Sequence, residues 1–434
     1  MAIKKNNKKH DVNSDVDSVL SSANKKTDYD LIIVGAGLVG ATLAASIASH
    51  SSNQNIKIAV IDQGAAPEIA SLTKESPAFD PRVVALTQDS IKLFESIGAW
   101  SAIGSMRACP YRFMRVWDNE GTGEISFDAS ELSQPQLGVI VENRILLSAV
   151  LAVLARLDNI TLLRGESVSE LAAQANNENN NKCSKRITLN NGQILQASLV
   201  IAADGAHSKI RELAGLKVRS WSYQQKAIVT TVKTENSHQD TAWQNFLVTG
   251  PLAFLPLDHV SKQYCSIVWS LDNAEADRLM ALPDDKFKVE LARAFQNRLG
   301  AIEHIDKRFC FPLTQTHAVS YIAPQIALVG DAAHVIHPLA GQGVNLGLLD
   351  AAALAAEITR ASERCLPLSD ESILRRYQRA RKQNNLQLMA LMESFKRLFG
   401  TKNLSVRWLR NTGIKKINQL TPVKKWLAKK AMGL

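Results

Sequence analysis

Near its N-terminus the chain contains the run Leu31-Ile32-Ile33-Val34-Gly35-Ala36-Gly37-Leu38-Val39-Gly40. Its first four residues are typical of a strand that is buried on both faces. The glycines have the spacing Gly-x-Gly-x-x-Gly, and the apolar residues 41–49 predict a helix. Residues 57–61 predict a second buried strand that ends at Asp62. Strand, glycine turn, helix, strand and acid in this order predict a dinucleotide-binding unit within an α/β fold.

The glycines and the acid have separate tasks in such a unit. Gly35 allows the tight turn, Gly37 lets a pyrophosphate approach the backbone, and Gly40 lets the helix pack closely on the strand. Asp62 stands 22 residues after Gly40 and is predicted to bind the ribose hydroxyls of an adenosine half.

Two later segments repeat the pattern of a buried strand followed by a polar turn. Residues 199–203 lead into Asp204-Gly205, and residues 325–329 lead into Gly330-Asp331. An Asp-Gly pair alone is a common turn, but here it lies between a predicted strand and a short helix. After the second turn, Gly341 and Gly343 precede a helix predicted over 343–360, whose positive end can face an anion or an electron-rich ring edge. Asp331 is placed to accept hydrogen bonds from a sugar hydroxyl.

Together these three motifs resemble the signatures of FAD-dependent aromatic hydroxylases of the p-hydroxybenzoate hydroxylase type. Within that group, residues 80–86, 141–144 and 337–347 resemble the polyprenyl-phenol hydroxylases of ubiquinone biosynthesis. The similarity extends over about residues 29–434. One departure is Asp62, because many of these flavoproteins carry Glu there; Asp can make the same ribose contact with a shorter reach.

The resemblance implies a Rossmann-like FAD-binding domain interleaved with an antiparallel-sheet substrate domain. It also implies an aromatic monooxygenase with FAD as cofactor, O2 as co-substrate and NAD(P)H as reductant. Reduced FAD would react with O2 to a C4a-hydroperoxide, from which oxygen passes to the ring of a polyprenylated phenol or quinol. Hydroxylases for the different ring carbons share these motifs, so the ring position stays open, although residues 106–113 and 241–257 suggest the late demethoxy-quinol step. By resemblance, FAD would be bound by Gly35, Gly37, Gly40, Asp62, Arg82, Arg144, Asp204, Gly205, Gly330, Asp331, Pro338, Gly341, Gly343 and Asn345.

No acid–base or metal motif accompanies these signatures, so the protein's task is to orient the ring, exclude water and stabilise negative charge on the flavin. For the last task we predict the backbone amides at the start of the helix. These belong to Gly341, Gln342, Gly343, Val344 and Asn345.

Several residues have a second interpretation. Arg82 and Arg144 would touch the ribose or phosphates of FAD, or else form surface ion pairs. An apolar substrate pocket is predicted along Phe254, Pro256 and Trp269, which could equally be core residues. His334 and His337 are interpreted as packing or loop-shaping residues rather than as metal ligands or a catalytic base.

Two other functions use the same scaffold. A flavoprotein reductase or dehydrogenase would not insert oxygen, and a non-catalytic subunit would bind FAD only to stabilise a membrane-associated assembly. Reductases with two dinucleotides usually carry a second Gly-x-Gly-x-x-Gly. This sequence lacks a second one, so the monooxygenase function is favoured. The reductant's site then has no sequence signature, and a partner protein could supply the electrons instead.

The chain of 434 residues is expected to form two interwoven domains. The FAD-binding domain would comprise residues 29–108, 141–214 and 308–390, and the substrate domain residues 109–140 and 215–307. Within the latter, residues 227–232, 253–257 and 264–270 predict antiparallel strands, with residues 111–117 and 123–127 pairing to the same sheet and a helix at 284–298. A disordered basic tail (1–28) and a basic helical extension (391–434) would flank them.

Charge is concentrated at the C-terminus. Residues 394–434 contain eleven Lys and Arg and no Asp or Glu, so the rest of the chain has a net charge of 10 − 11 = −1. Basic residues mixed with Trp and Leu are typical of a segment that lies on an anionic membrane, although helices packed on the body would also fit. Nucleic acid is not expected as a partner, because no nucleic-acid motif is present.

The cysteines and hydropathy give the expected location. Five cysteines (Cys109, Cys183, Cys265, Cys310 and Cys365) without a Cys-x-x-Cys spacing indicate reduced thiols of a cytosolic protein. No apolar run reaches the roughly 18 residues of a membrane span. The expected location is therefore cytoplasmic and peripheral at the inner face of the cell membrane, where a ubiquinone-biosynthesis complex is a candidate partner.

Overall fold

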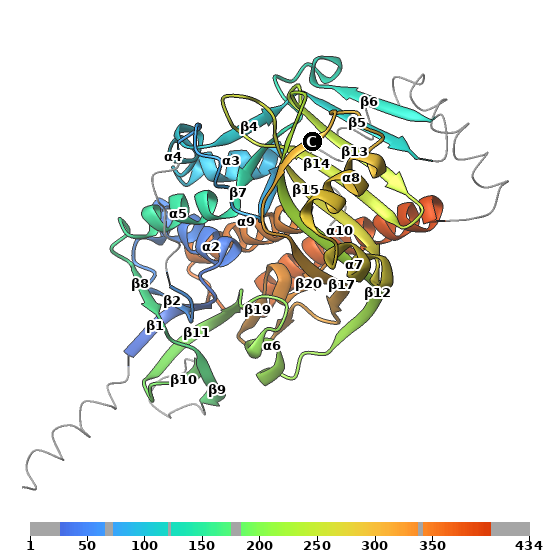
Figure 1. Cartoon of the computed structure of the whole chain (residues 1–434). Coiled ribbons are helices and arrows are strands. Elements are labelled where there is room, and N and C mark those ends of the chain that lie inside the picture. The colour runs from blue at the N-terminus through green and yellow to red at the C-terminus, as the bar shows by residue number, and fades with distance from the viewer. Residues whose placement is uncertain (1–26, 66–72, 120–122, 175–183, 337–341, 401–434) are drawn as a thin grey trace, which may run out of the picture.

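The computed structural model describes residues 27–65, 73–119, 123–174, 184–336 and 342–400 (Figure 1). Its first layer is an eight-stranded sheet with a parallel centre in the order β19 (Ile326–Leu328), β11 (Ile194–Ala202), β1 (Thr27–Val34), β2 (Ile58–Asp62) and β8 (Ile160–Arg164). The predicted strands at 31–34, 57–61, 199–203 and 325–329 all lie in this centre. Within them, residues 31–34, 58–61, 199–202 and 326–328 are buried, which explains the continuous apolar runs.

Antiparallel strands extend the first sheet. β18 (Ile322–Ala323) pairs with β19, and β10 (Ser184–Leu189) pairs with both β11 and β9 (Val168–Gln174). The strands β9 and β10 flank the asparagine-rich residues 176–181 in the sequence and pair with each other in antiparallel register.

Helices cover the parallel strands (Figure 1). α2 (Leu38–Ala48) follows the glycine turn and packs against α5 (Asn143–Leu154) and α9 (Gln342–Glu363). α9 packs in turn on α10 (Glu371–Gly400) and on α3 (Gln88–Ser96). Two shorter helices complete this part, α4 (Trp100–Ser105) and α6 (Lys209–Leu213).

The second layer is a nine-stranded, mostly antiparallel sheet. Its order is β20 (His334–Val335), β17 (Phe309–Ala318), β12 (Val218–Thr234), β15 (Tyr264–Asp272), β14 (Gly250–Pro256), β13 (Thr241–Leu247), β5 (Phe113–Asp118) and β6 (Glu124–Asp128), with β16 (Ile302–Ile305) attached to β12. The predicted pairing of the segments near 111–117 and 123–127 with this sheet is confirmed, because β5 pairs with β13 and β6 with β5. α7 (Asn273–Met280) and α8 (Asp284–Ala294) pack on its outer face (Figure 1).

A small sheet of β3 (Val83–Leu86), β7 (Gly138–Glu142) and β4 (Ala108–Tyr111) joins the two layers. The chain crosses between the two layers more often than the predicted domain boundaries imply. In particular β17, expected with residues 308–390 of the cofactor part, pairs with β12 in the second sheet. β20 belongs to the same sheet and directly follows the Gly330-Asp331 turn. The segment that carries this turn is therefore hydrogen-bonded to the nine-stranded sheet.

Candidate active site

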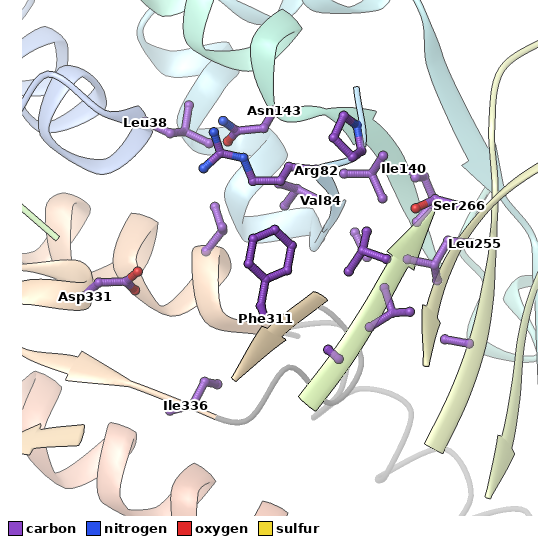
Figure 2. A pocket seen from close by; sticks show the side chains of 18 of the residues that line it. Leu38, Arg82, Val84, Ile140, Asn143, Leu255, Ser266, Phe311, Asp331 and Ile336 are labelled. Atoms are coloured by element: carbon purple, nitrogen blue, oxygen red, sulfur yellow. The ribbon is translucent and has the colours of Figure 1, made fainter. Parts of the chain in front are cut away.

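A cavity of about 870 Å³ lies between the two layers, and residues from all three sequence motifs line it (Figure 2). On the first side it is lined by Gly37, Arg82, Gly205, Asp331 and Val344, which come from five separate segments. The other side is the inner face of the nine-stranded sheet. The fold therefore brings the three sequence motifs together around one space.

The glycine turn between β1 and α2 has the geometry that its sequence predicts. Gly35 has φ +105°, and a Cβ atom there would lie 2.3 Å from the carbonyl oxygen of Ala203. A Cβ atom on Gly40 would lie 2.0 Å from the carbonyl oxygen of Gly35, so only glycine lets the helix begin this close to the strand. Gly37 has no atom within 4 Å of such a position and faces open space.

Asp62 reaches back to this turn from the end of β2. Its two carboxylate oxygens accept hydrogen bonds from the backbone amides of Ala36 and Gly64, both at 2.6 Å. The carboxylate therefore fixes the conformation of the glycine turn. Its expected contact with a ribose remains a prediction, and Asp62 itself is not among the residues that line the cavity.

The Asp204-Gly205 turn presents a carboxylate oxygen that has no protein donor. Asp204 Oδ2 accepts a hydrogen bond from the amide of Ile210 at 3.1 Å. The Oδ1 atom is buried and has no hydrogen-bond partner among the described residues. Because buried polar atoms are normally paired, this oxygen is suited to accept a ligand hydroxyl.

Arg211 joins this turn to the Gly330-Asp331 turn. Its guanidinium donates to the carbonyl oxygens of Ala206 and Ala332, both at 2.8 Å. The three-residue element Gly330–Ala332 is a 3-10 turn, in which Gly330 has φ +59°. The positions of the two polar turns are therefore coupled by one side chain.

Asp331 points into the cavity, as Figure 2 shows. Surrounding protein atoms raise the pKa of its carboxyl group, while the nearby His334 acts in the opposite direction. A carboxyl group that is open to the cavity but partly desolvated favours hydrogen bonding to a ligand. The contact of Asp331 with a sugar hydroxyl stays a prediction.

The start of α9 borders the same space. Its first turn begins with Gln342, Gly343 and Val344, whose backbone amides have no partner within the helix. Val344 lines the cavity. The predicted residues Pro338 and Gly341, together with His337, lie outside the described residues.

Asn345 also has a role that the sequence did not indicate. Its side chain is buried, donates to the carbonyl oxygen of Ala85 at 2.8 Å, and accepts from the Ser90 hydroxyl at 2.7 Å and the Thr87 amide at 3.1 Å. It therefore ties the first turn of α9 to the end of β3 and the start of α3. This long-range contact has no local sequence signal.

The two predicted arginines lie in different environments. Arg82 lines the cavity beside Asn143 and Leu38 (Figure 2). The Arg144 guanidinium instead binds Glu142 Oε2, with Nε at 3.0 Å and Nη2 at 2.8 Å. Of the residues after β7, Asn143 rather than Arg144 lines the cavity.

Glu142 and Arg107 are buried residues that the sequence interpretation did not single out. Arg107 Nη2 lies 2.6 Å from Glu142 Oε1, and its guanidinium donates to the carbonyl oxygens of Ser76 and Ala78. The amide of Asp80 also donates to Glu142. These contacts fix residues 76–80, which precede Arg82 at the cavity. An acidic residue at the end of the apolar run 138–142 was the available sequence signal.

The substrate-side wall is formed by the neighbours of the predicted residues. Phe254 is fully buried and stacks on Phe295 at 3.8 Å between ring centroids, while Trp269 packs near Phe287 in the same core. Neither these two nor Pro256 lines the cavity; Ala253, Leu255, Ser266 and Val268 do. Because side chains alternate along a strand, the predicted contacts are displaced by one residue on β14 and β15.

Behind the Gly330-Asp331 turn lies a buried ionic network centred on Asp350. Its carboxylate accepts from the amide of Gly330 at 3.1 Å, contacts His334 Nε2 at 2.5 Å, and binds Arg381 Nε at 2.7 Å. Burial alone would raise the pKa of Asp350, but His334 and Arg381 outweigh it and hold the pKa below its usual value. His334 is thus a structural partner, as its packing interpretation predicted.

The described residues contain no group of three or more potential metal ligands among His, Cys, Asp and Glu. In the same part of the chain, no helix is long and apolar enough to cross a membrane. Cys109, Cys265, Cys310 and Cys365 are free thiols. Burial raises the pKa of the Cys109 and Cys265 thiols, which makes these two inert core residues.

Known proteins share this sequence and architecture. A family model described as "FAD binding domain" matches residues 28–391. The 3-demethoxyubiquinol 3-hydroxylase of Escherichia coli is 35% identical over 405 residues, which cover 93% of this chain and 98% of that protein. Ubiquinone hydroxylase UbiL of Rhodospirillum rubrum is also 35% identical, with 96% and 91% covered. The crystal structure of p-nitrophenol 4-monooxygenase PnpA from Pseudomonas putida has the same fold, with a TM-score of 0.71, 17% identity and 94% and 98% of the two chains covered.

The residues of the cavity fit the cofactor of this family. Gly37 leaves room for a close backbone approach, and the first turn of α9 offers amides. Next to the lining residue Gly205, Asp204 Oδ1 has no donor among the described residues. The matched regions include all three motifs that line the cavity. From its sequence and its site, the chain belongs to the FAD-dependent monooxygenase family that includes the ubiquinone-biosynthesis hydroxylases.

Proposed function

We propose that this protein hydroxylates the aromatic ring of a polyprenylated phenol or quinol in ubiquinone biosynthesis, with 3-demethoxyubiquinol as substrate. The observation that supports this function is the composition of the cavity. Cofactor-binding turns form one wall, and apolar side chains of an antiparallel sheet form the other. The similarity to the E. coli demethoxyubiquinol hydroxylase over 98% of that protein favours the late step.

When bound, FAD supplies the oxygen activation, with NAD(P)H as reductant, O2 as the oxygen source and the substrate ring as acceptor. The protein's residues bind the cofactor, orient the substrate ring and exclude water. We assign the stabilisation of negative charge on the reduced ring system to the backbone amides at the start of α9. We assign hydrogen bonds to the cofactor to Arg82, Asp204 and Asp331, and a supporting role to Arg144 through Glu142.

Complementation tests this function. The gene is expressed in bacterial strains that each lack one ring hydroxylase of ubiquinone biosynthesis, and the quinone precursors are extracted and identified. We expect demethoxyubiquinol to disappear in the strain that lacks the late hydroxylase. Rescue of another strain would reassign the ring carbon, and rescue of none despite bound FAD would exclude the monooxygenase function.

Isotope labelling separates this function from a reductase on the same scaffold. A monooxygenase incorporates one atom from labelled O2 into the product ring, whereas a reductase consumes NAD(P)H without labelling the ring. The labelled product is read by mass spectrometry of the extracted quinol.

We further propose that the protein binds the inner face of the cell membrane through residues 391–434, which also favours membership of a biosynthetic complex. Eleven basic residues and interspersed apolar ones support this interpretation. Deleting residues 394–434 should reduce the affinity for anionic liposomes in a sedimentation assay by more than tenfold, since each basic residue near the surface contributes about 1 kcal/mol and about 1.4 kcal/mol corresponds to a factor of ten.

Deleting residues 1–26 is the matched control for this experiment, because that segment also contains several lysines. It should leave liposome binding unchanged. Equal binding by the chain without residues 394–434 would reject the membrane role of the C-terminal segment.

A further inference from the structure

One hydroxyl group on the substrate-side wall lacks a partner. Ser266 lies on β15 and is fully buried, and its Oγ atom has no hydrogen-bond partner among the described residues. It is nevertheless one of the residues that line the cavity, next to Leu255 on the neighbouring strand (Figure 2). An unpaired buried hydroxyl costs about 1–3 kcal/mol, so its retention in the middle of an apolar strand requires an explanation.

The neighbours of Ser266 on this wall, Leu255 and Val268, are apolar. Gln244 on β13 and Tyr111 on β4 also line the cavity, separated by residues such as Leu255 and Val268. Both can therefore offer polar atoms to a molecule inside the cavity. Burial raises the pKa of Tyr111 to about 12, so its phenol remains protonated and able to donate.

The spacing of Ser266 and Gln244 suits a ligand between them. Ser266 pairs with Leu255, and Gln244 pairs with Ala253, so the two polar residues share one face of the sheet with β14 between them. Two strand spacings and a two-residue offset separate their Cα atoms by about 12 Å. They are therefore too distant to bond to each other through a serine side chain, but a single aromatic ring with oxygen substituents fits between them.

We propose that the Ser266 hydroxyl binds an oxygen substituent on the aromatic ring of the substrate and, with Gln244, sets which ring carbon faces the flavin. This inference rests on the proposed function and deepens it by naming residues that determine specificity. A hydroxyl both donates and accepts, so Ser266 can bond to a phenol or to a methoxy oxygen. The apolar walls make that contact selective, because a ring without the oxygen leaves the hydroxyl unpaired.

The test compares Ser266→Ala with the unsubstituted enzyme, both loaded with FAD. The probe is a demethoxyubiquinol analogue with a short prenyl tail, and its Kd is measured from the change in flavin absorbance without turnover. We expect Ser266→Ala to raise this Kd about tenfold, as for one lost hydrogen bond. We also expect more NAD(P)H to be oxidised per hydroxylated product, because the ring is less well oriented.

Thermal unfolding without the analogue distinguishes this role from a structural one. Removing a hydroxyl that has no protein partner should leave Tm unchanged or raise it, whereas loss of a structural hydrogen bond would lower Tm. Ser270→Ala is the matched control, since Ser270 is equally buried on the same strand but does not line the cavity. Ser266→Cys keeps the shape with a weaker donor and should give an intermediate Kd.

An unchanged Kd and an unchanged ratio of product to oxidised NAD(P)H in Ser266→Ala would overturn the inference. A lower Tm of Ser266→Ala with the Kd retained would assign Ser266 to the fold instead. Failure of the proposed function has a different signature. In that case the unsubstituted enzyme binds phenolic rings but forms no hydroxylated quinol, and the Kd comparison between the variants still decides the role of Ser266.

Discussion

Replacing Asp350 with alanine is expected to lower the free energy of unfolding by about 3–5 kcal/mol, because it leaves buried charge without a counter-ion. The Arg381 side chain is 8% exposed and would lose its carboxylate partner at 2.7 Å. His334 and the Gly330 amide would lose theirs as well. Equilibrium unfolding in urea measures the difference in free energy of unfolding. The variant should also retain less FAD, because the Gly330-Asp331 turn is less restrained.

The effect of Asp350 should also depend on pH. Its pKa is held below that of an unfolded-state aspartate, so its stabilising contribution is fully present above about pH 4 and is lost as the pH falls through the folded-state pKa. The difference in free energy of unfolding between the unsubstituted protein and Asp350→Ala should therefore become smaller in acid.

Glu371→Ala is the control for this substitution. Glu371 pairs with Arg375 on the exposed surface of α10, with exposed side-chain fractions of 72% and 65%. Such a surface pair contributes less than about 1 kcal/mol. If Asp350→Ala lowers the free energy of unfolding no more than Glu371→Ala does, the buried network is not important for stability.

Gly40→Ala is expected to give the largest loss of FAD binding. A Cβ atom at this position would lie 2.0 Å from the backbone carbonyl oxygen of Gly35 and 2.9 Å from Cβ of Ala203. Because neither contact is with a flexible side-chain end, α2 must move away from β1, at a cost of about 2 kcal/mol or more. FAD affinity should fall by about 30-fold or more, measured by fluorescence titration of the apoprotein.

Gly104→Ala provides a matched change at a helical glycine. Gly104 lies in α4, and no atom lies within 4 Å of the place that an added methyl group would take. Its replacement should leave FAD affinity unchanged and stabilise the helix by about 0.5–1 kcal/mol. Equal FAD affinity in Gly40→Ala and Gly104→Ala would refute the close-packing role of Gly40.

The parts of the fold that local sequence determines were predicted well. The buried strands of the first layer, the glycine turn and the helix after it agree with the structure to within a few residues, because each carries a short-range signal in its own residues. The convergence of Gly37, Gly205 and Asp331 on one cavity was also predictable, since parallel strands end at the same edge of a sheet.

The wall facing the substrate was predicted less accurately for a physical reason. Residues 253–257 are apolar on both faces of the strand, so alternation alone cannot distinguish Leu255, which lines the cavity, from Phe254, which packs in the core. The pairing of Asp350 with Arg381 and of Glu142 with Arg107 depends on contacts between distant segments. Neither leaves a periodic pattern in the sequence.

The pairing of β20 with β17 has a consequence for how this scaffold diversifies. Main-chain hydrogen bonds connect the flavin-side segment to the ring-side sheet, with Thr316 opposite Val335 and His317 opposite His334. Main-chain geometry is nearly independent of side-chain identity, so the separation of the two walls is preserved when residues on β14 and β15 change. New regioselectivity can therefore evolve by a few side-chain substitutions, without any need to rebuild the distance between oxidant and ring.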